Sequence, residues 1–125
     1  MNVILIGPDL EENLSLGYLA SALEERGHSA ECARLNSPQD EPAVLEAVAV
    51  ADMVGLSLSY QAFAREYLGL ARRIKSLVPH TVIVAGGGYA SCVADELLEN
   101  HPEVDLVVIG EGEETICEVA DNLEL

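Results

Sequence analysis

The segment Val82-Ile83-Val84-Ala85-Gly86-Gly87-Gly88 decides the fold class of this chain. It is a short apolar run that breaks into three glycines just before a helical pattern begins. Such a run is typical of a buried strand in a parallel sheet. Parallel α/β sheets bind ligands at the carboxyl ends of their strands, which is where these glycines fall. Because glycine has no side chain, a ligand can approach the backbone closely there.

The same succession of apolar run, glycine and helical spacing returns at Asp105–Thr115, and strand and helix patterns alternate along the whole chain. The expected strands are Asn2–Ile6, Ala30–Arg34, Met53–Leu58, Thr81–Ala85 and Asp105–Ile109. The expected helices are Leu14–Arg26, Pro42–Val50, Ala62–Leu77, Ala90–Glu99 and Glu113–Leu123. These units predict one α/β domain over residues 1–125 with a flavodoxin-like (Rossmann-like), doubly wound parallel sheet. The expected order of its five strands is 2-1-3-4-5, with helices on both faces and the polar second strand outermost.

Charge and cysteine content exclude several classes of function. The net charge is −16, from 22 acidic and 6 basic residues, so we expect neither nucleic acid nor a membrane surface as a partner. An acidic face for a basic protein partner stays open as a reading of that charge. The three cysteines have no paired or clustered spacing, and we expect no signal peptide, since the chain begins with a strand-like run. We therefore expect reduced thiols, a cytoplasmic location and no zinc or iron–sulfur site.

The loops that follow the expected strands do not fit the common phosphate-binding motifs. Gly7–Asn13 has neither the glycine spacing of a dinucleotide fingerprint nor the terminal Gly-Lys-Ser/Thr of a P-loop, and it carries acids. A phosphorylatable receiver domain would need Asp after the third strand and Lys after the fifth. The chain has Ser57-Leu58-Ser59-Tyr60 and Gly110-Glu111 at these places, so we reject that reading.

Three loops nevertheless offer groups to a ligand. The hydroxyls of Ser57–Tyr60 can bind a polar ligand or can cap the next helix. Gly86–Gly88 can form a tight turn, but two glycines suffice for that, and the third favours close approach of a ligand. The acids of Gly110–Thr115 lie at a helix start, where dipole complementation and capping explain much of their presence.

Taken together, these loops resemble those of the cobalamin (vitamin B12)-binding domain. The serine-containing turn after the third strand and the Gly-Gly turn after the fourth are signature positions of that family. Gly110-Glu111-Gly112-Glu113 after an Asp-headed apolar strand is similar in particular to the N-terminal domains of cobalamin-dependent radical S-adenosylmethionine enzymes. Two motifs are missing here: the Asp-x-His-x-x-Gly loop whose histidine binds cobalt, and the Cys-x-x-x-Cys-x-x-Cys cluster motif of the radical domain.

The resemblance implies a module that binds methylcobalamin or hydroxocobalamin base-off, with no histidine or other metal ligand from the protein. It implies methyl transfer completed by a radical S-adenosylmethionine or methyltransferase domain or chain, with no catalysis by this chain alone and no catalytic residues in it. A homodimer is a further expectation. The cofactor-binding residues it implies are Pro8, Asp9, Leu10, Asn13, Ser57, Leu58, Ser59, Tyr60, Gly86, Gly87, Gly88, Tyr89, Gly110, Glu111 and Gly112.

Two alternatives remain open. One is a degenerate flavodoxin-like domain that has lost its cofactor and serves as an interaction or oligomerisation module. The other is a site for a different nucleotide-like ligand at the same edge. The order of elements predicts that His28, His80 and His101 all lie at the amino edge of the sheet, at the surface or at helix ends. We also expect Gly87 and Gly88 to serve the ligand more than the fold.

Overall fold

A computed structural model describes residues 1–8, 13–58, 61–110 and 112–124 of the chain, without the side chains of residues 13–15, 61–63, 113 and 124. The strands are β1 (Asn2–Gly7), β2 (Ser29–Arg34), β3 (Met53–Ser57), β4 (Val82–Gly86) and β5 (Leu106–Val107). The helices are α1 (Asn13–Glu25), the 3-10 helix η1 (Pro38–Asp40), α2 (Glu41–Val48), α3 (Gln61–Leu77), α4 (Gly88–Cys92), α5 (Ala94–Asn100) and α6 (Glu113–Glu124).

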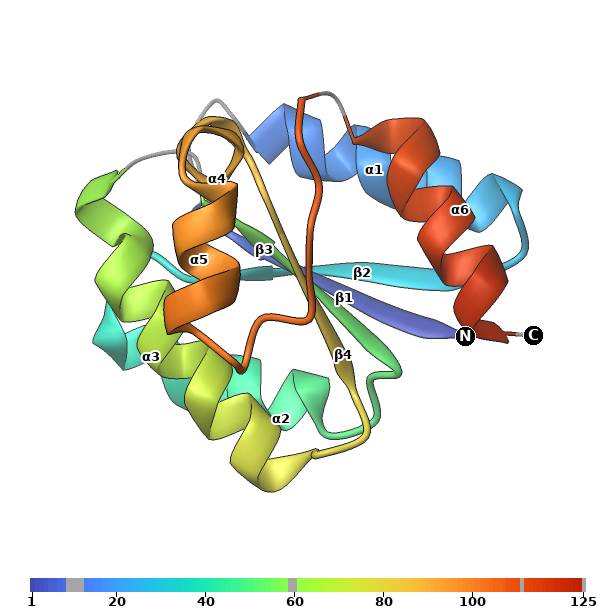
Figure 1. Cartoon of the computed structure of the whole chain (residues 1–125). Helices are drawn as coiled ribbons and strands as arrows, with labels where there is room; N and C mark the ends of the chain where they lie inside the picture. The colour runs from blue at the N-terminus through green and yellow to red at the C-terminus, as the bar shows by residue number, and fades with distance from the viewer. Residues whose placement is uncertain (9–12, 59–60, 111, 125) are drawn as a thin grey trace.

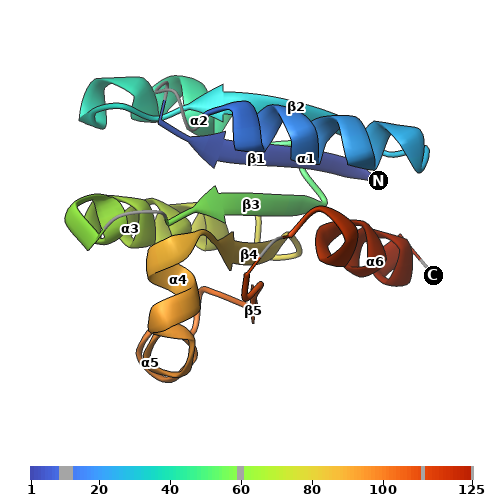
Figure 2. The same cartoon turned by 90° about the horizontal axis from the view of Figure 1, so that it is seen from above.

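The strands form one parallel sheet in the order β2-β1-β3-β4-β5, which confirms the predicted topology (Figures 1 and 2). β2 lies at the edge, and its residues are exposed or half-buried, as its polar composition predicts. The register pairs Leu5 with Gly55, and Gly55 with Val84. These residues therefore form one row across the three central strands, and they reappear below as the floor of a cavity.

Helices cover both faces of the sheet, and each face has its own apolar core. Helices α1 and α6 pack on one face, and α2, α3 and α5 pack on the other (Figures 1 and 2). Side chains alternate along a strand, so Val3 and Leu5 of β1 join the first core while Ile4 and Ile6 join the second. We call these the α1/α6 face and the α2/α3 face.

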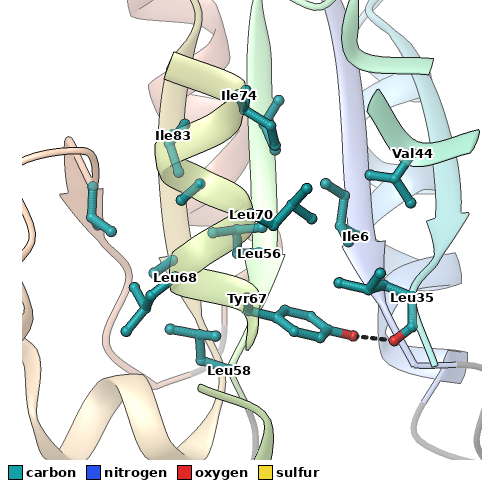
Figure 3. Close-up of a cluster of buried hydrophobic side chains, with 14 of the residues drawn as sticks. Ile6, Leu35, Val44, Leu56, Leu58, Tyr67, Leu68, Leu70, Ile74 and Ile83 are labelled. Carbon is teal, nitrogen blue, oxygen red and sulfur yellow. Dashed lines mark hydrogen bonds between the residues drawn. The ribbon is translucent and has the colours of Figure 1, made fainter. Parts of the chain in front are cut away.

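The α2/α3 face is closely filled around a buried tyrosine (Figure 3). Tyr67 is 1% exposed, and its hydroxyl donates a hydrogen bond of 2.8 Å to the carbonyl oxygen of Leu35. Burial raises the pKa of this hydroxyl well above its usual range, with smaller contributions from Glu66 and Asp40. The phenol therefore stays neutral and joins α3 to the loop after β2.

Two expected elements were wrong in extent. β5 is only two residues long. At its amino end the Ile83 N–H donates to the Asp105 carboxylate (2.8 Å), where a regular ladder would use a backbone carbonyl. The helix expected over Ala90–Glu99 is two helices, α4 and α5, which meet at Val93 with non-helical dihedrals (φ −121°, ψ 25°). The N–H of Ala90 donates to the carbonyl of Leu58, which ties α4 to the end of β3 and fixes its direction.

Several apolar helix positions that the spacing directs inward are exposed instead. They are Leu77 (64%), Leu98 (45%) and Leu123 (40%). Leu77 and Leu123 lie in the last turns of α3 and α6. Among the residues that the structure describes, no helix combines the length and the apolar character needed to cross a membrane.

Candidate functional site

A cavity of about 450 Å³ opens between α1 and α6, at the carboxyl ends of β1, β3 and β4. This volume falls within the range that small-molecule pockets usually have. The cavity is therefore at the edge of the sheet where the sequence predicts a ligand. Its lining residues are Leu5, Leu16, Tyr18, Leu19, Gly55, Leu56, Ser57, Val84, Gly86, Gly87, Gly88, Val108, Gly110, Gly112 and Ile116.

The floor of the cavity consists of two rows of strand residues on the α1/α6 face. The row nearer the carboxyl ends contains the paired residues Ser57 and Gly86. The deeper row contains Leu5, Gly55 and Val84, which are paired across β1, β3 and β4. The small paired residues Ser57 and Gly86 leave the hollow, since no large side chain rises from these two positions of β3 and β4.

Glycine creates this space in two different ways. At Gly86 the backbone φ is not positive, and an added Cβ would meet no atom within 4 Å, so the missing side chain leaves open volume. At Gly55 a Cβ would lie 2.7 Å from Leu5 Cδ2, and at Gly7 it would lie 2.5 Å from Leu16 Cδ1. Gly55 and Gly7 therefore let Leu5 and Leu16 lie close to the sheet, while Gly86 keeps the cavity itself empty.

Gly87 differs from its two neighbours, because its φ of 105° belongs to a region that side chains rarely adopt. It caps the start of α4, so the turn itself requires glycine there. Gly87 therefore serves the fold as well as lining the cavity, and its greater importance for the ligand stays a prediction. Gly110, with φ of 78°, is a second turn glycine of the rim, and its N–H donates to Ser91 Oγ at 3.0 Å.

The structure brings six of the sequence-predicted residues together around the cavity: Ser57, Gly86, Gly87, Gly88, Gly110 and Gly112. Two others face the opposite side, since Leu58 is fully buried in the core of the α2/α3 face and Tyr89 packs against it. The backbone of Leu58 still has a structural role, because its N–H donates to the carbonyl of Gly86 at 2.7 Å.

The remaining predicted residues contribute nothing to the lining that the structure describes. Pro8 is buried and is not among the residues that line the cavity. Asn13 begins α1, but its side chain lies outside the described part of the chain. Predicted residues that lie wholly outside the described part are Asp9, Leu10, Ser59, Tyr60 and Glu111.

Sequence reasoning missed the residues that form the deep part of the cavity. They are Leu5, Leu16, Leu19, Gly55, Val84, Val108 and Ile116. Most of them are apolar residues at strand or helix spacing, and residues of the hydrophobic core show the same pattern. Gly55 was the available signal, because a glycine inside an apolar strand often marks a place where another group approaches the backbone.

The described side chains that line the cavity are almost entirely hydrocarbon. Polar atoms come from Ser57, at the end of β3, and from Tyr18, which is 63% exposed at the rim. None of these lining side chains is an acid, a base or a histidine. Within the described residues no three His, Cys, Asp or Glu side chains gather as a metal site. The cavity therefore suits the apolar part of an organic ligand, with the hydroxyl-bearing side chains of Ser57 and Tyr18 as its described polar groups.

All three histidines are described, and all lie at the opposite, amino edge of the sheet, as predicted. His80 is exposed, His101 is half-buried, and His28 is buried (5% exposed) between the end of α1 and the start of β2. His28 Nε2 lies 2.8 Å from Asp121 Oδ1, and Arg26 Nη1 donates to Asp121 Oδ2 at 2.6 Å. These bonds lower the pKa of the Asp121 carboxyl, and they connect the end of α1 to α6.

Comparison with solved structures supports the assigned fold. A response regulator from Thermotoga maritima superposes with a TM-score of 0.72 at 15% identity, covering 98% of this chain and 97% of that chain. The monomethylamine corrinoid protein of Methanosarcina barkeri superposes with a TM-score of 0.71 at 14% identity, covering 94% of this chain and 57% of that chain. Identities this low show a shared fold alone.

Sequence comparison carries more information. The hopanoid C-3 methylase of Methylococcus capsulatus is 35% identical over 105 residues, which cover 82% of this chain and 20% of that protein. The chain thus spans about a fifth of the length of this curated relative. The family model described as the B12 binding domain matches residues 6–120, which include every residue of the cavity except Leu5. The chain belongs to the B12-binding domain family.

Proposed function

We propose that this chain is a cobalamin-binding module that holds the nucleotide tail of the cofactor in the cavity between α1 and α6. The observation that supports this most directly is the hollow over Gly86, at the carboxyl ends of the central strands, in a chain that belongs to the B12-binding family. The corrin ring would lie over the same edge of the sheet, above Gly87, Gly88 and Gly110.

The residues of the cavity fit such a tail. Gly86 provides a cradle that a side chain would fill, and the walls from Leu16 and Ile116 suit an aromatic base. In this proposal the Ser57 hydroxyl hydrogen-bonds the polar part of the tail or a corrin amide, since Ser57 lines the cavity at the end of β3. The chemistry that bound cobalamin supplies is the transfer of a methyl group through cobalt.

The proposal includes the state in which the cofactor binds: base-off, with no histidine from the protein on the cobalt. Its support is the position of His28, His80 and His101 at the amino edge, because the cavity opens at the carboxyl edge. The tail that fills the cavity cannot at the same time coordinate the cobalt of the ring outside it.

The system that the module serves is, in this proposal, a methyl-transfer reaction in the cytoplasm. The relative is named a methylase, and the loops resemble those of cobalamin-dependent radical S-adenosylmethionine enzymes. The described lining residues of the cavity include no pair of nucleophile and base, so a separate catalytic domain or partner would carry out the chemistry. The acidic charge of −16 favours a partner with a basic contact surface.

The first experiment is to mix the purified protein with hydroxocobalamin, desalt it and record a visible spectrum. We expect the red cofactor to stay with the protein, and the paramagnetic resonance spectrum of the cob(II)alamin form to show no nitrogen splitting from an axial ligand. A triple variant with Gln at positions 28, 80 and 101 should retain the cofactor with the same spectrum. Nitrogen splitting would contradict the histidine-free state, and colourless protein would favour the alternative of an interaction module without cofactor.

A further inference from the structure

The polarity of the cavity changes with depth. The shallow row of the floor consists of Ser57 and Gly86, the last paired residues of β3 and β4. The deeper row is Leu5, Gly55 and Val84. Leu5 and Val84 have hydrocarbon side chains, and Gly55 has no side chain. A ligand group that reaches the deeper row thus passes beyond the last described hydroxyl.

The backbone does not restore polar partners at that depth. Gly55 lies in β3, which pairs with β1 on one side and with β4 on the other. The peptide groups around Gly55 are therefore used in the hydrogen bonding of the sheet. On the wall, the N–H of Val108 donates to the carbonyl of Ala85, and the N–H of Ile116 donates to the carbonyl of Gly112. These donors are therefore already committed within the protein.

We propose that this cavity selects among corrinoids by the polarity of the base at the end of the tail, and that Val84 is a specificity-determining residue. The favoured class is an apolar aromatic base such as dimethylbenzimidazole, and the disfavoured class is a purine such as adenine. The inference rests on the proposed function, because it assumes that the tail of a corrinoid occupies the cavity.

The physical reason is the cost of desolvation. A purine has an exocyclic amine and several ring nitrogens that hydrogen-bond water, and each loses that partner beside the side chains of Leu5 and Val84. A buried polar group left without a partner disfavours binding strongly, whereas the methyl groups of dimethylbenzimidazole gain from leaving water. One unpartnered group alone predicts a preference of about tenfold for the benzimidazole.

The experiment compares three corrinoids on the wild-type protein by equilibrium titration: cobalamin, its analogue with adenine as the lower base, and cobinamide, which has no base. We expect cobalamin to bind about tenfold or more tightly than either of the others. Adenine coordinates cobalt more weakly than dimethylbenzimidazole and dissociates from it more readily. This difference alone would favour base-off binding of the adenine analogue, so tighter binding of cobalamin would have to come from the cavity. Equal affinity for cobalamin and the adenine analogue would overturn the inference. Failure of every corrinoid to bind would overturn the proposed function instead, and the inference with it.

A pair of nearly isosteric variants tests the assigned residue. Val84→Thr adds a hydroxyl to the cavity floor, and Val54→Thr adds one to the opposite face of the neighbouring strand, with both valines buried (2% and 0% exposed). We expect Val84→Thr to reduce the preference for cobalamin over the adenine analogue about threefold or more, and Val54→Thr to leave the preference unchanged. An unchanged preference in Val84→Thr, or an equal change in both variants, would overturn the role of Val84. If neither variant folds, the three-corrinoid comparison on the wild type still decides the inference.

Discussion

The two faces of the sheet use the same strands for opposite purposes. On the α2/α3 face, Leu56 and Ile83 of the sheet belong to the same buried core as Tyr67 of α3 (Figure 3). On the α1/α6 face the corresponding region of β3 and β4 presents Gly55 and Gly86, and a cavity remains. Stability and ligand binding are thus separated by the thickness of one sheet, and substitutions on the two faces should affect different measurements.

The largest effect on stability should come from the filled face. Leu70 of α3 is fully buried in that core, so Leu70→Ala should lower the free energy of unfolding by about 2–5 kcal/mol, as measured by urea denaturation. The dissociation constant for cobalamin of the variant that remains folded should not change. The matched control is Leu77→Ala on the same helix, where the side chain is 64% exposed and little stability is lost. A large loss of affinity in Leu70→Ala at a temperature where it is folded would contradict the separation of the two faces.

Occupation of the hollow face should give the next largest effect. A ligand that binds only the folded state stabilises it by about 2.7 kcal/mol when its free concentration is a hundred times its dissociation constant. We expect this increment in the wild type when denaturation is repeated with hydroxocobalamin, and the same increment in Leu70→Ala. If the cofactor raises the stability of neither protein, the tail does not fill the α1/α6 cavity.

Filling the cavity with a side chain should separate binding from folding. Gly86 has an ordinary φ, and its Cβ would point into open space, so Gly86→Leu should fold and should bind cobalamin roughly 5- to 150-fold more weakly. Gly69→Leu is the control on α3, where a Cβ would meet only the Arg73 guanidinium at 3.8 Å. Wild-type affinity in Gly86→Leu would show that the tail lies elsewhere. Gly87→Leu is a poorer test, because its positive φ would strain the turn as well.

The smallest effect should come from the amino edge of the α1/α6 face. The pKa of Asp121 is lowered by its bonds to His28 and Arg26, so its carboxylate stabilises the fold above the ordinary pKa of 3.8 and loses that effect as the pH falls further. Asp121→Asn should therefore be less stable than the wild type near neutral pH, and the gap should close below about pH 4. Glu118→Gln, also on α6, controls for the loss of one negative charge from an acidic protein. A gap that stays constant from neutral to acid pH would contradict this role.

The sequence was sufficient to predict the sheet order and the mouth of the cavity, because both depend on local signals. Alternating strand and helix patterns fix the order of the elements, and the glycines at 86–88 mark the end of a central strand. The depth of the cavity depends instead on register: Leu5, Gly55 and Val84 lie far apart in the sequence and meet only through strand pairing. The sequence also did not show that the side chains of Leu58 and Tyr89 lie on the α2/α3 face. Their direction depends on how α4 is anchored to the end of β3.

The glycine at position 86 has a consequence for anyone who engineers this domain. Glycine inside a strand is less favourable than alanine by roughly 0.5–1 kcal/mol, and here an added methyl group meets no obstacle. A selection for thermal stability carried out without cofactor would therefore favour substitution of this glycine. The consensus sequence of the selected variants would then have a side chain in the cavity. Screens for stable variants of this domain should include cobalamin in the growth medium from the first round, since only with bound cofactor does the absence of a side chain at position 86 stabilise the protein.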